Sequence, residues 1–201
     1  MHTLAPFDPQ AVADLMALSS RRLRISCETY HAMAEALLPL GRTELIDGHV
    51  IAMSPIGPAH AHTVYRIARL LEDAVRGQER GRPRIYVQSP LRLDDGTEPE
   101  PDLAVLRADL DETRIPTAAD ALLVVEVSDA TERFDRTVKL PRYAAAGIPE
   151  VWIALPAART VERYRQPTTD GYAERSRYQA GDELEALGGL LPVGAMFPAA
   201  D

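Results

Sequence analysis

The segments EPDLAVL (residues 100–106), LLVVEVSD (122–129) and DRTVKLPRYAAAGIPE (135–150) decide the fold of this chain. The second segment begins with four consecutive apolar residues and shows no polar alternation, as expected of a strand covered on both faces of a sheet. The third segment has a largely helical pattern and leads into the apolar run VWIAL (151–155). A strand, a helix and another strand in this order predict a parallel pair of strands joined by a right-handed crossover.

Each of the first two segments carries one carboxylate, Asp102 and Glu126, and Lys139 follows on the next predicted helix. A buried carboxylate without a partner is costly, so it needs a cation, a hydrogen-bond donor or a metal ion. We therefore predict that Asp102 and Glu126 share a divalent metal ion and that Lys139 lies beside it. The structural alternative is an Asp at a strand start, a Glu paired with a nearby Arg, and a solvated Lys.

The helix predicted over residues 131–146 contains Pro141. Proline inside a helix removes a hydrogen bond and clashes with the preceding turn. Either the helix proper starts near Pro141, where proline is favoured at the first position, or it kinks there. Gly147 and Pro149 predict its end.

Composition predicts a single globular domain over residues 26–201, with an N-terminal extension over residues 1–25. The chain has 201 residues, of which 46% are hydrophobic, which is enough for a proper core. The formal net charge of −8 argues against a protein that coats nucleic acid, because that affinity comes from basic residues. It does not exclude a nuclease, since bound metal and a local basic patch can attract a phosphate.

Cysteine content and hydropathy indicate a cytoplasmic protein. The single cysteine, Cys27, excludes an internal disulfide and is expected to be a small core residue in a reducing compartment. No stretch of about eighteen apolar residues is present, so no membrane span is expected. The start of the chain lacks the basic region of a secretory signal.

Residues 1–25 look peripheral. Gln10–Ser19 has the pattern of a short helix, and Arg21, Arg22 and Arg24 follow it as either a phosphate contact or a solvated turn. Ser26 is a predicted N-cap for a helix that runs to about Leu38.

The segment Glu44–Met53, ELIDGHVIAM, predicts a β-hairpin around the tight-turn pair Asp47-Gly48. Glu44 stands at the start of its first strand. Two interpretations of Glu44 remain open, an active-site carboxylate and an exposed strand end.

A helix over residues 59–76 is predicted from apolar residues at three- and four-residue steps. His60 lies on the inward stripe and His62 on a different face, which argues against a two-histidine metal site. His60 is a candidate contact for a substrate phosphate or a water, with a purely structural histidine as the alternative.

Alternation along Leu103–Leu106 places Asp102, Ala104 and Leu106 on one face of a strand. The same reasoning places Leu122, Val124, Glu126 and Ser128 on one side of the central strand. Further elements are a strand over 85–93, a turn over 94–97, a hairpin joining 161–165 to 172–178, and an apolar segment over 184–197 that packs back on the body.

Arg133 and Arg136 lie near Glu126 and Lys139 in sequence and are candidate phosphate contacts. The basic loop over residues 77–84 is either a second phosphate patch or a solvated loop. Motifs for other chemistries, namely a P-loop, GxSxG, CxxC and HExxH, are absent from the sequence.

Several blocks of the sequence together resemble the Uma-type restriction endonuclease family of the PD-(D/E)xK nuclease superfamily. These blocks are RTELIDGHVIAMSP (42–55), HAHTVYRIARLL (60–71), EPEPDLAVLR (98–107), LVVEVSD (123–129), DRTVKLPRYAAAGIPEVWI (135–153) and TVERYR (160–165). The resemblance implies an α/β (α+β) fold, with a restriction-endonuclease-like mixed β-sheet flanked by helices and additional β-hairpins. It also implies a magnesium-dependent phosphodiesterase-type site, with manganese as an alternative ion.

Residue by residue, the resemblance makes Asp102 the aspartate of the motif and Glu126 its second acid. The lysine of the superfamily normally lies two residues after that acid, where this chain has Ser128. Lys139 fits the place of a lysine moved onto the following helix, and the backbone carbonyl of Val127 would be a further metal ligand.

Glu44 and His60 match family positions that are expected to face the same pocket. The implied function is metal-dependent hydrolysis of DNA, with a catalytically inactive nucleic-acid or protein-binding module as the alternative. A homodimer is expected because cutting two strands suits a two-fold pair. The apolar tail Leu190–Phe197 and the terminal hairpin are candidate contacts.

Overall fold

The computed structural model of the chain describes residues 23–76, 78, 81–129 and 131–199. The elements are α2 (Cys27–Ala32), α3 (Ala34–Leu37), η1 (Leu38–Leu40), β1 (Thr43–Ile46), β2 (His49–Ala52), α4 (Pro58–Val75), β3 (Arg84–Val87), β4 (Leu103–Leu106), η2 (Ala118–Asp120), β5 (Ala121–Val127), α5 (Glu132–Phe134), η3 (Asp135–Lys139), α6 (Leu140–Ala145), β6 (Glu150–Leu155), β7 (Thr160–Thr168), β8 (Gly171–Gln179), β9 (Glu183–Ala186), β10 (Gly189–Pro192) and η4 (Val193–Met196). The predicted helix Gln10–Ser19 and two arginines of the predicted triplet, Arg21 and Arg22, lie outside the described residues.

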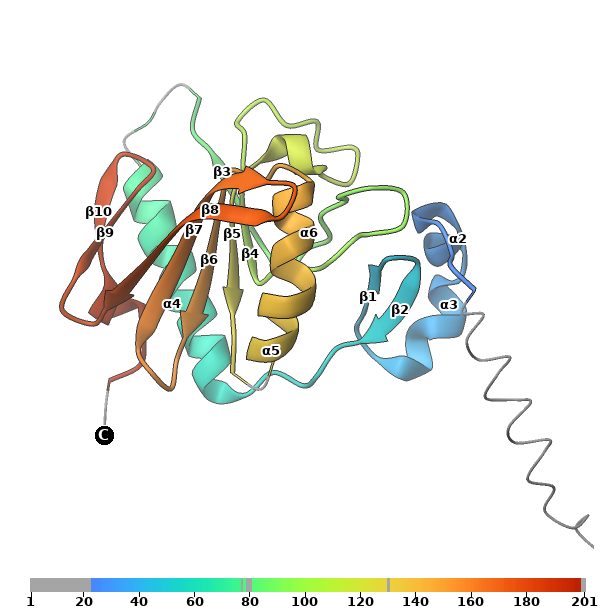
Figure 1. The fold of residues 1–201 in the computed structure, drawn as a ribbon, viewed down its shortest axis with the longest axis horizontal. Coiled ribbons are helices and arrows are strands. Elements are labelled where there is room, and N and C mark those ends of the chain that lie inside the picture. Colours follow the sequence, from blue (N-terminus) through green and yellow to red (C-terminus); the bar gives the residue numbers. More distant parts are fainter. Residues whose placement is uncertain (1–22, 77, 79–80, 130, 200–201) are drawn as a thin grey trace, which may run out of the picture.

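A six-stranded mixed sheet in the order β3-β4-β5-β6-β7-β8 forms the centre of the structure (Figure 1). β5 and β6 are parallel, with Val124 opposite Val151, and the other neighbouring pairs in the sheet are antiparallel. The predicted parallel pair and the mixed α/β fold class are therefore confirmed. The most apolar strand of the sequence, β5, lies between β4 and β6, where both of its faces are covered.

Helices cover both faces of the sheet, and each face has its own apolar core (Figure 1). On one face, Ile67 and Leu71 of α4 pack against a cluster that includes Val125 and Trp152. On the other face, Tyr143 of α6 packs with strand residues whose side chains point to that face and with Ile148, which follows the helix. The strand residues are Ala104, Leu106, Val124 and Ile153. Each buried side chain of this size stabilises the fold by roughly 1.5–3 kcal/mol.

The helical segment after β5 changes type before its proline. α5 is followed by the π-helical segment η3 and then by α6, which carries Pro141 in its first turn. The predicted alternative that the helix proper starts near Pro141 is therefore confirmed, because proline is tolerated in the first turn of a helix. The π-helical turn before α6 was not predicted. The end of α6 is as predicted: Gly147 has φ 78°, and the N–H of Ile148 donates to the carbonyl of Tyr143, as in a Schellman motif.

The predicted β1–β2 hairpin is confirmed, with Asp47 at φ 50° and Gly48 at φ 75° in its turn. Both residues have the positive φ that a two-residue hairpin turn requires. Nε of Arg142 on α6 donates to the Asp47 carboxylate at 3.0 Å. This ion pair holds the hairpin against the helix, so β1 lies close to η3.

Two predictions about strands were wrong. The strand predicted over residues 85–93 ends at Val87, because Gln88 has φ 45° and Pro90 follows it without an N–H for the ladder. Leu122 does not share the side of Val124. The pairing of β4 with β5 shifts register between Val105 and Leu106, and Leu122 is 36% exposed.

Other predicted elements are confirmed. Ser26 caps α2 by accepting from the N–H of Thr29, although the helix predicted to about Leu38 breaks at Met33. The helix predicted over 59–76, the turn over 94–97 and the hairpin of 161–165 with 172–178 are present as α4, the Asp94–Thr97 bridge and β7–β8.

The C-terminal segment packs back on the body, as predicted. Leu184, Leu191, Met196 and Phe197 join the core on the α4 face, whereas Leu190 is 61% exposed. Most apolar side chains of the candidate dimer contact are therefore used within the chain, and the homodimer stays a prediction. No helix in the described part of the chain is both long and apolar enough to cross a membrane.

The hairpin turn generates a stability prediction with a matched control. Gly48 has φ 75° and Gly147, which follows α6, has φ 78°, but a Cβ at Gly48 would lie 2.7 Å from the Cβ of Arg24, whereas a Cβ at Gly147 would meet nothing within 4 Å. Both alanine variants bear the strain of a positive φ, about 1–2 kcal/mol. We expect Gly48→Ala to lose about 1–3 kcal/mol more than Gly147→Ala in urea unfolding, because of the clash. Equal losses would contradict this packing.

Candidate active site

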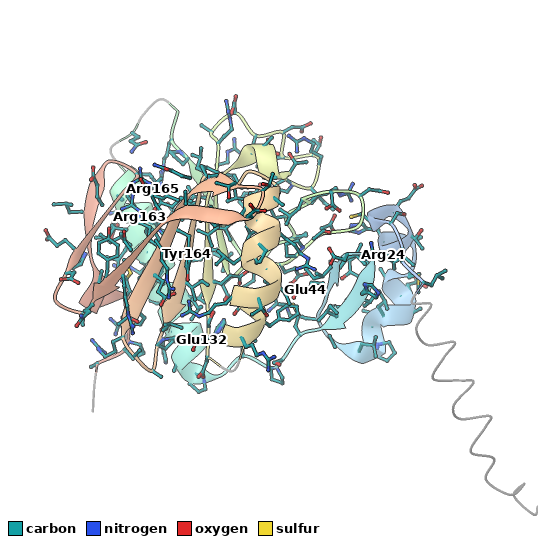
Figure 2. The ribbon with its side chains drawn as sticks, in the orientation of Figure 1. Arg24, Glu44, Glu132, Arg163, Tyr164 and Arg165 are labelled. Atoms are coloured by element: carbon teal, nitrogen blue, oxygen red, sulfur yellow. The ribbon has the colours of Figure 1, made fainter. Side chains whose placement is uncertain are left out.

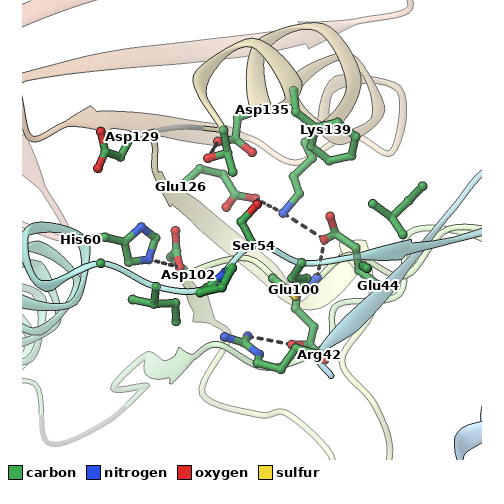
Figure 3. Close-up of a pocket in the computed structure, with 18 residues that line it drawn as sticks. Arg42, Glu44, Ser54, His60, Glu100, Asp102, Glu126, Asp129, Asp135 and Lys139 are labelled. Carbon is green, nitrogen blue, oxygen red and sulfur yellow. Dashed lines mark hydrogen bonds and ion pairs between the residues drawn. The ribbon is translucent and has the colours of Figure 1, made fainter. Parts of the chain in front are cut away.

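One pocket of ≈ 350 Å³ collects most of the site residues predicted from the sequence (Figure 3). Its walls come from β1, the β2–α4 connection, the start of α4, the residues before β4, the end of β5, and the α5–η3 segment. Glu44, His60, Asp102, Glu126 and Lys139 all line it. Segments far apart in the sequence thus meet at one end of the parallel strand pair.

Asp102 is fixed between the central strand and α4. One carboxylate oxygen accepts the backbone N–H of Val127 at 2.8 Å, and the other accepts from Nε2 of His60 at 2.9 Å. The amide of Gln88 lies at 3.4 Å from the same oxygen as His60. Asp102 is only 8% exposed, so these donors hold its carboxylate in one orientation at the end of β5.

Glu126 is the penultimate residue of β5 and is buried. Burial raises the pKa of Glu126 to about 8, and the nearby carboxylates of Asp135 and Asp102 add to this, while Lys139 opposes it. The hydroxyl of Tyr143 donates to Oε1 of Glu126 at 2.6 Å. Burial is thus the main reason that Glu126 favours its neutral form, and the neighbouring carboxylates contribute less.

Lys139 lies between two carboxylates. Its Nζ is 2.9 Å from Oε2 of Glu44 and 3.3 Å from Oε1 of Glu126, and all three side chains are buried (Figure 3). Burial opposes the charge on the amine, but Glu126, Glu44 and Asp135 outweigh it and raise the pKa of Lys139. The structure thus brings together the three groups, Asp102, Glu126 and Lys139, that the sequence predicted to meet.

Glu44 is buried, so the alternative of an exposed strand end was wrong. It points from β1 toward the α5–α6 helix (Figure 2). Its Oε2 accepts the backbone N–H of Glu100 at 3.2 Å in addition to its ion pair with Lys139. Glu44 therefore orients the amine from the side opposite to Glu126.

The two histidines of α4 lie on different faces, as predicted. The hydrogen bond to Asp102 raises the pKa of His60, and burial works against it. His62 is exposed and does not line the pocket. His60 therefore contacts Asp102, a candidate metal ligand, and helps to orient its carboxylate.

The two candidate phosphate contacts lie away from the pocket. Arg136 does not line the pocket. Its Nη1 donates to the Glu162 carboxylate, and its Nε donates to the Glu132 carboxylate at 3.0 Å. Arg133 is exposed and does not line the pocket either. Their contact with phosphate stays a prediction, because the structure shows the charge of Arg136 already paired.

Sequence reasoning missed Asp135, a buried carboxylate that lines the same pocket. Its Oδ2 accepts from the hydroxyls of Ser128 and Thr131, both at 2.7 Å. Its spacing of four residues before Lys139 was an available signal, since residues so spaced share a helix face. Ser128, at the usual position of the superfamily lysine, thus binds this carboxylate.

The donor set fits a hard divalent cation in charge and atom type. The buried residues that line the pocket include four carboxylates but one ammonium group, that of Lys139. The carboxylates are those of Glu44, Asp102, Glu126 and Asp135. Carboxylate oxygens are the ligands that magnesium prefers, usually one or two of them with water. In the part of the chain that the structure describes, no three His, Cys, Asp or Glu side chains form a group that could hold a metal ion by themselves.

The family model described as "Putative restriction endonuclease", Uma2, matches residues 27–194. The chain belongs to the Uma2 family. The resemblance predicted from the sequence blocks is thereby confirmed, and the whole of the predicted N-terminal extension, residues 1–25, lies outside the match.

A solved structure has a similar fold. It is the crystal structure of "a putative nuclease belonging to DUF820" from Anabaena variabilis, with a TM-score of 0.60 and 15% sequence identity. The similarity covers 77% of this chain and 89% of that chain. The likeness confirms the nuclease-type fold of the Uma2 chain. No curated protein matches the sequence.

The buried ion pairs generate a stability prediction. Lys139→Met leaves Glu44 and Glu126 without their cation, and such a loss destabilises a protein by about 3–5 kcal/mol. We expect a lower urea midpoint with an unchanged m-value. The double variant Lys139→Met/Glu44→Gln should recover part of the loss, because it removes one uncompensated carboxylate. A single variant as stable as the parent would contradict this electrostatic account.

The Arg136 contact generates a pH prediction. Burial opposes ionisation of Glu162, but hydrogen bonds from Arg136, Tyr164 and Arg175 lower its pKa from 4.5 to about 2. A carboxyl whose folded pKa is depressed stabilises above its unfolded pKa and loses that contribution as pH falls. Glu162→Gln should therefore be less stable at pH 7 by roughly 1–3 kcal/mol, with a flatter stability profile between pH 4.5 and 2. Glu174→Gln on β8 is the control, and identical profiles would refute the prediction.

Proposed function

We propose that this Uma2 chain is a metal-dependent endonuclease that hydrolyses DNA phosphodiester bonds. The observation that carries the proposal is the ion pair of the Lys139 amine with Glu126, 3.3 Å away, in the pocket that Asp102 also lines. Family membership and the nuclease-type fold support the same reaction class.

Asp102, Glu126 and the carbonyl of Val127 are the proposed ligands of magnesium or manganese. When bound, such an ion would polarise a phosphate oxygen and lower the pKa of a bound water. The N–H of Val127 and the ring of His60 hold the Asp102 carboxylate in place. Groups that orient a ligand in this way commonly tune the affinity of a metal site.

Lys139 is the proposed group that orients the attacking water and offsets charge that develops on the phosphate. Glu44 holds its amine near Glu126. In the hydrolysis, the water oxygen bonds to phosphorus, the bond from phosphorus to one ester oxygen breaks, and that oxygen leaves with a proton. Burial opposes the charge on this amine, but Glu126 and Glu44 raise the pKa of Lys139 and so favour its charged form.

A cleavage assay tests the proposal. We expect DNA, supplied both as a double-stranded plasmid and as a single-stranded circle, to be cut in at least one of these forms with Mg²⁺ or Mn²⁺. Asp102→Asn and Lys139→Met should lose about 10²–10³-fold in rate on the same form, as for other removed electrostatic contacts. His62→Ala, on the exposed face of α4, should retain the parental rate. Thermal unfolding of each variant separates loss of chemistry from loss of fold.

Equal activity in the parent, Asp102→Asn and Lys139→Met would indicate contamination or another site. A calorimetric titration with Mn²⁺ distinguishes the alternative of an inactive binding module. An active site should bind Mn²⁺, with binding weakened by Glu126→Gln, whereas an inactive module should bind little and tolerate that substitution.

A further inference from the structure

The pocket has an extended apolar lining beside its carboxylates. All seven consecutive residues from Ile51 to Gly57, at the end of β2 and in the connection to α4, line it. Ser54 is the only polar residue among them (Figure 3). Ile56 is 42% exposed, so an apolar side chain is presented to a ligand at the mouth of the pocket.

An aromatic side chain adds to this lining from a different element. Phe134, the last residue of α5, is half-buried and lines the same pocket as Ile56. It directly precedes Asp135, so the aromatic ring and the buried carboxylate come from adjacent positions. A flat apolar ligand on this surface would share one pocket with the proposed metal ligands Asp102 and Glu126.

The charges of the pocket are poorly suited to gripping a long phosphate backbone. Among the residues that the structure describes, six carboxylates and two permanent cations line the pocket. The carboxylates are those of Glu44, Glu100, Asp102, Glu126, Asp129 and Asp135, and the cations are Arg42 and Lys139. Both cations are paired, Arg42 with Glu100 at 2.8 Å and Lys139 with two carboxylates. Proteins hold duplex DNA mainly through lysine and arginine side chains that contact many phosphates. This pocket does not offer such a set of free cations.

We propose that the pocket takes an unpaired nucleotide, with its base against Phe134 and Ile56 and its phosphodiester at Asp102 and Glu126. This inference rests on the proposed nuclease function and adds the substrate class, single-stranded nucleic acid. In a duplex the base faces are covered by stacking, whereas an unpaired base can lie on an aromatic ring. Single-stranded DNA and RNA share this chemistry.

A binding measurement tests the inference without requiring cleavage. Fluorescein-labelled oligo-dT, oligo-rU and a mixed-sequence duplex are titrated with the full chain in Ca²⁺, with fluorescence anisotropy as the readout. We expect the better of the two single strands to bind at least about tenfold tighter than the duplex. The salt dependence should be shallow, with a slope of magnitude below about 2, since only a few phosphates are contacted.

Variants locate the contact. Phe134→Ala should weaken single-strand binding by about tenfold, and Ile56→Ser, on an exposed loop where folding is not at risk, should weaken it by a smaller factor. Tyr65→Ala is the matched control, because Tyr65 is an aromatic residue of α4 that is 59% exposed and does not line the pocket. Calorimetric Mn²⁺ binding should be unchanged in all three variants.

The outcomes separate this inference from the proposed function. Preference for either single strand supports the inference, and the stronger ligand shows which sugar is favoured. Duplex binding that is equal or tighter, unchanged binding in both pocket variants, or no binding to any probe would overturn it. If the duplex is preferred while plasmid is still cut in a manner dependent on Asp102, the nuclease function stands and the inference falls.

Discussion

The ammonium group of Lys139 between Glu44 and Glu126 is the interaction on which the arrangement of the pocket depends. Burying one amine with two carboxylates is favourable only if its geometry is held, because each ion loses its hydration. The three side chains come from a hairpin, a central strand and a π-helical segment. Their joint burial therefore fixes these elements relative to one another. It also fixes the end of β5, where the backbone N–H of Val127 donates to the Asp102 carboxylate.

The surrounding structure supplies that geometry by ordinary packing and pairing. The ion pair of Arg142 with Asp47 holds the β1–β2 hairpin against α6. Tyr143, one residue further along the helix, packs in the core and donates to Glu126. Pro141 lies in the first turn of α6, directly after η3, where proline is tolerated. The continuous helical segment η3–α6 thus combines a docking contact, a core contact and the amine of the pocket.

Sequence patterns predicted the central features where local rules and burial agree. The uninterrupted apolar run of β5, the alternation of β4 and the hairpin turn at Asp47-Gly48 each have one strong local explanation, and the structure confirms them. The strand predicted past Val87 failed because the positive φ of Gln88 has no signal in its residue type. The prediction for the side of Leu122 was wrong because the pairing of β5 with β4 contains a register shift. Such a shift depends on the neighbouring strand and leaves no signal in the periodicity of β5 itself.

By itself the sequence determined the elements, the family blocks and which residues carry candidate chemistry, because periodicity, turn residues and residue types are local properties. Only the tertiary structure decided that Glu44 is buried on Lys139, that Asp135 joins the pocket and that Arg136 is paired with Glu162. It alone placed the apolar residues from Ile51 to Gly57 beside the carboxylates. Distances between distant segments follow from how two helical layers pack on one twisted sheet, and no single segment of the chain encodes them.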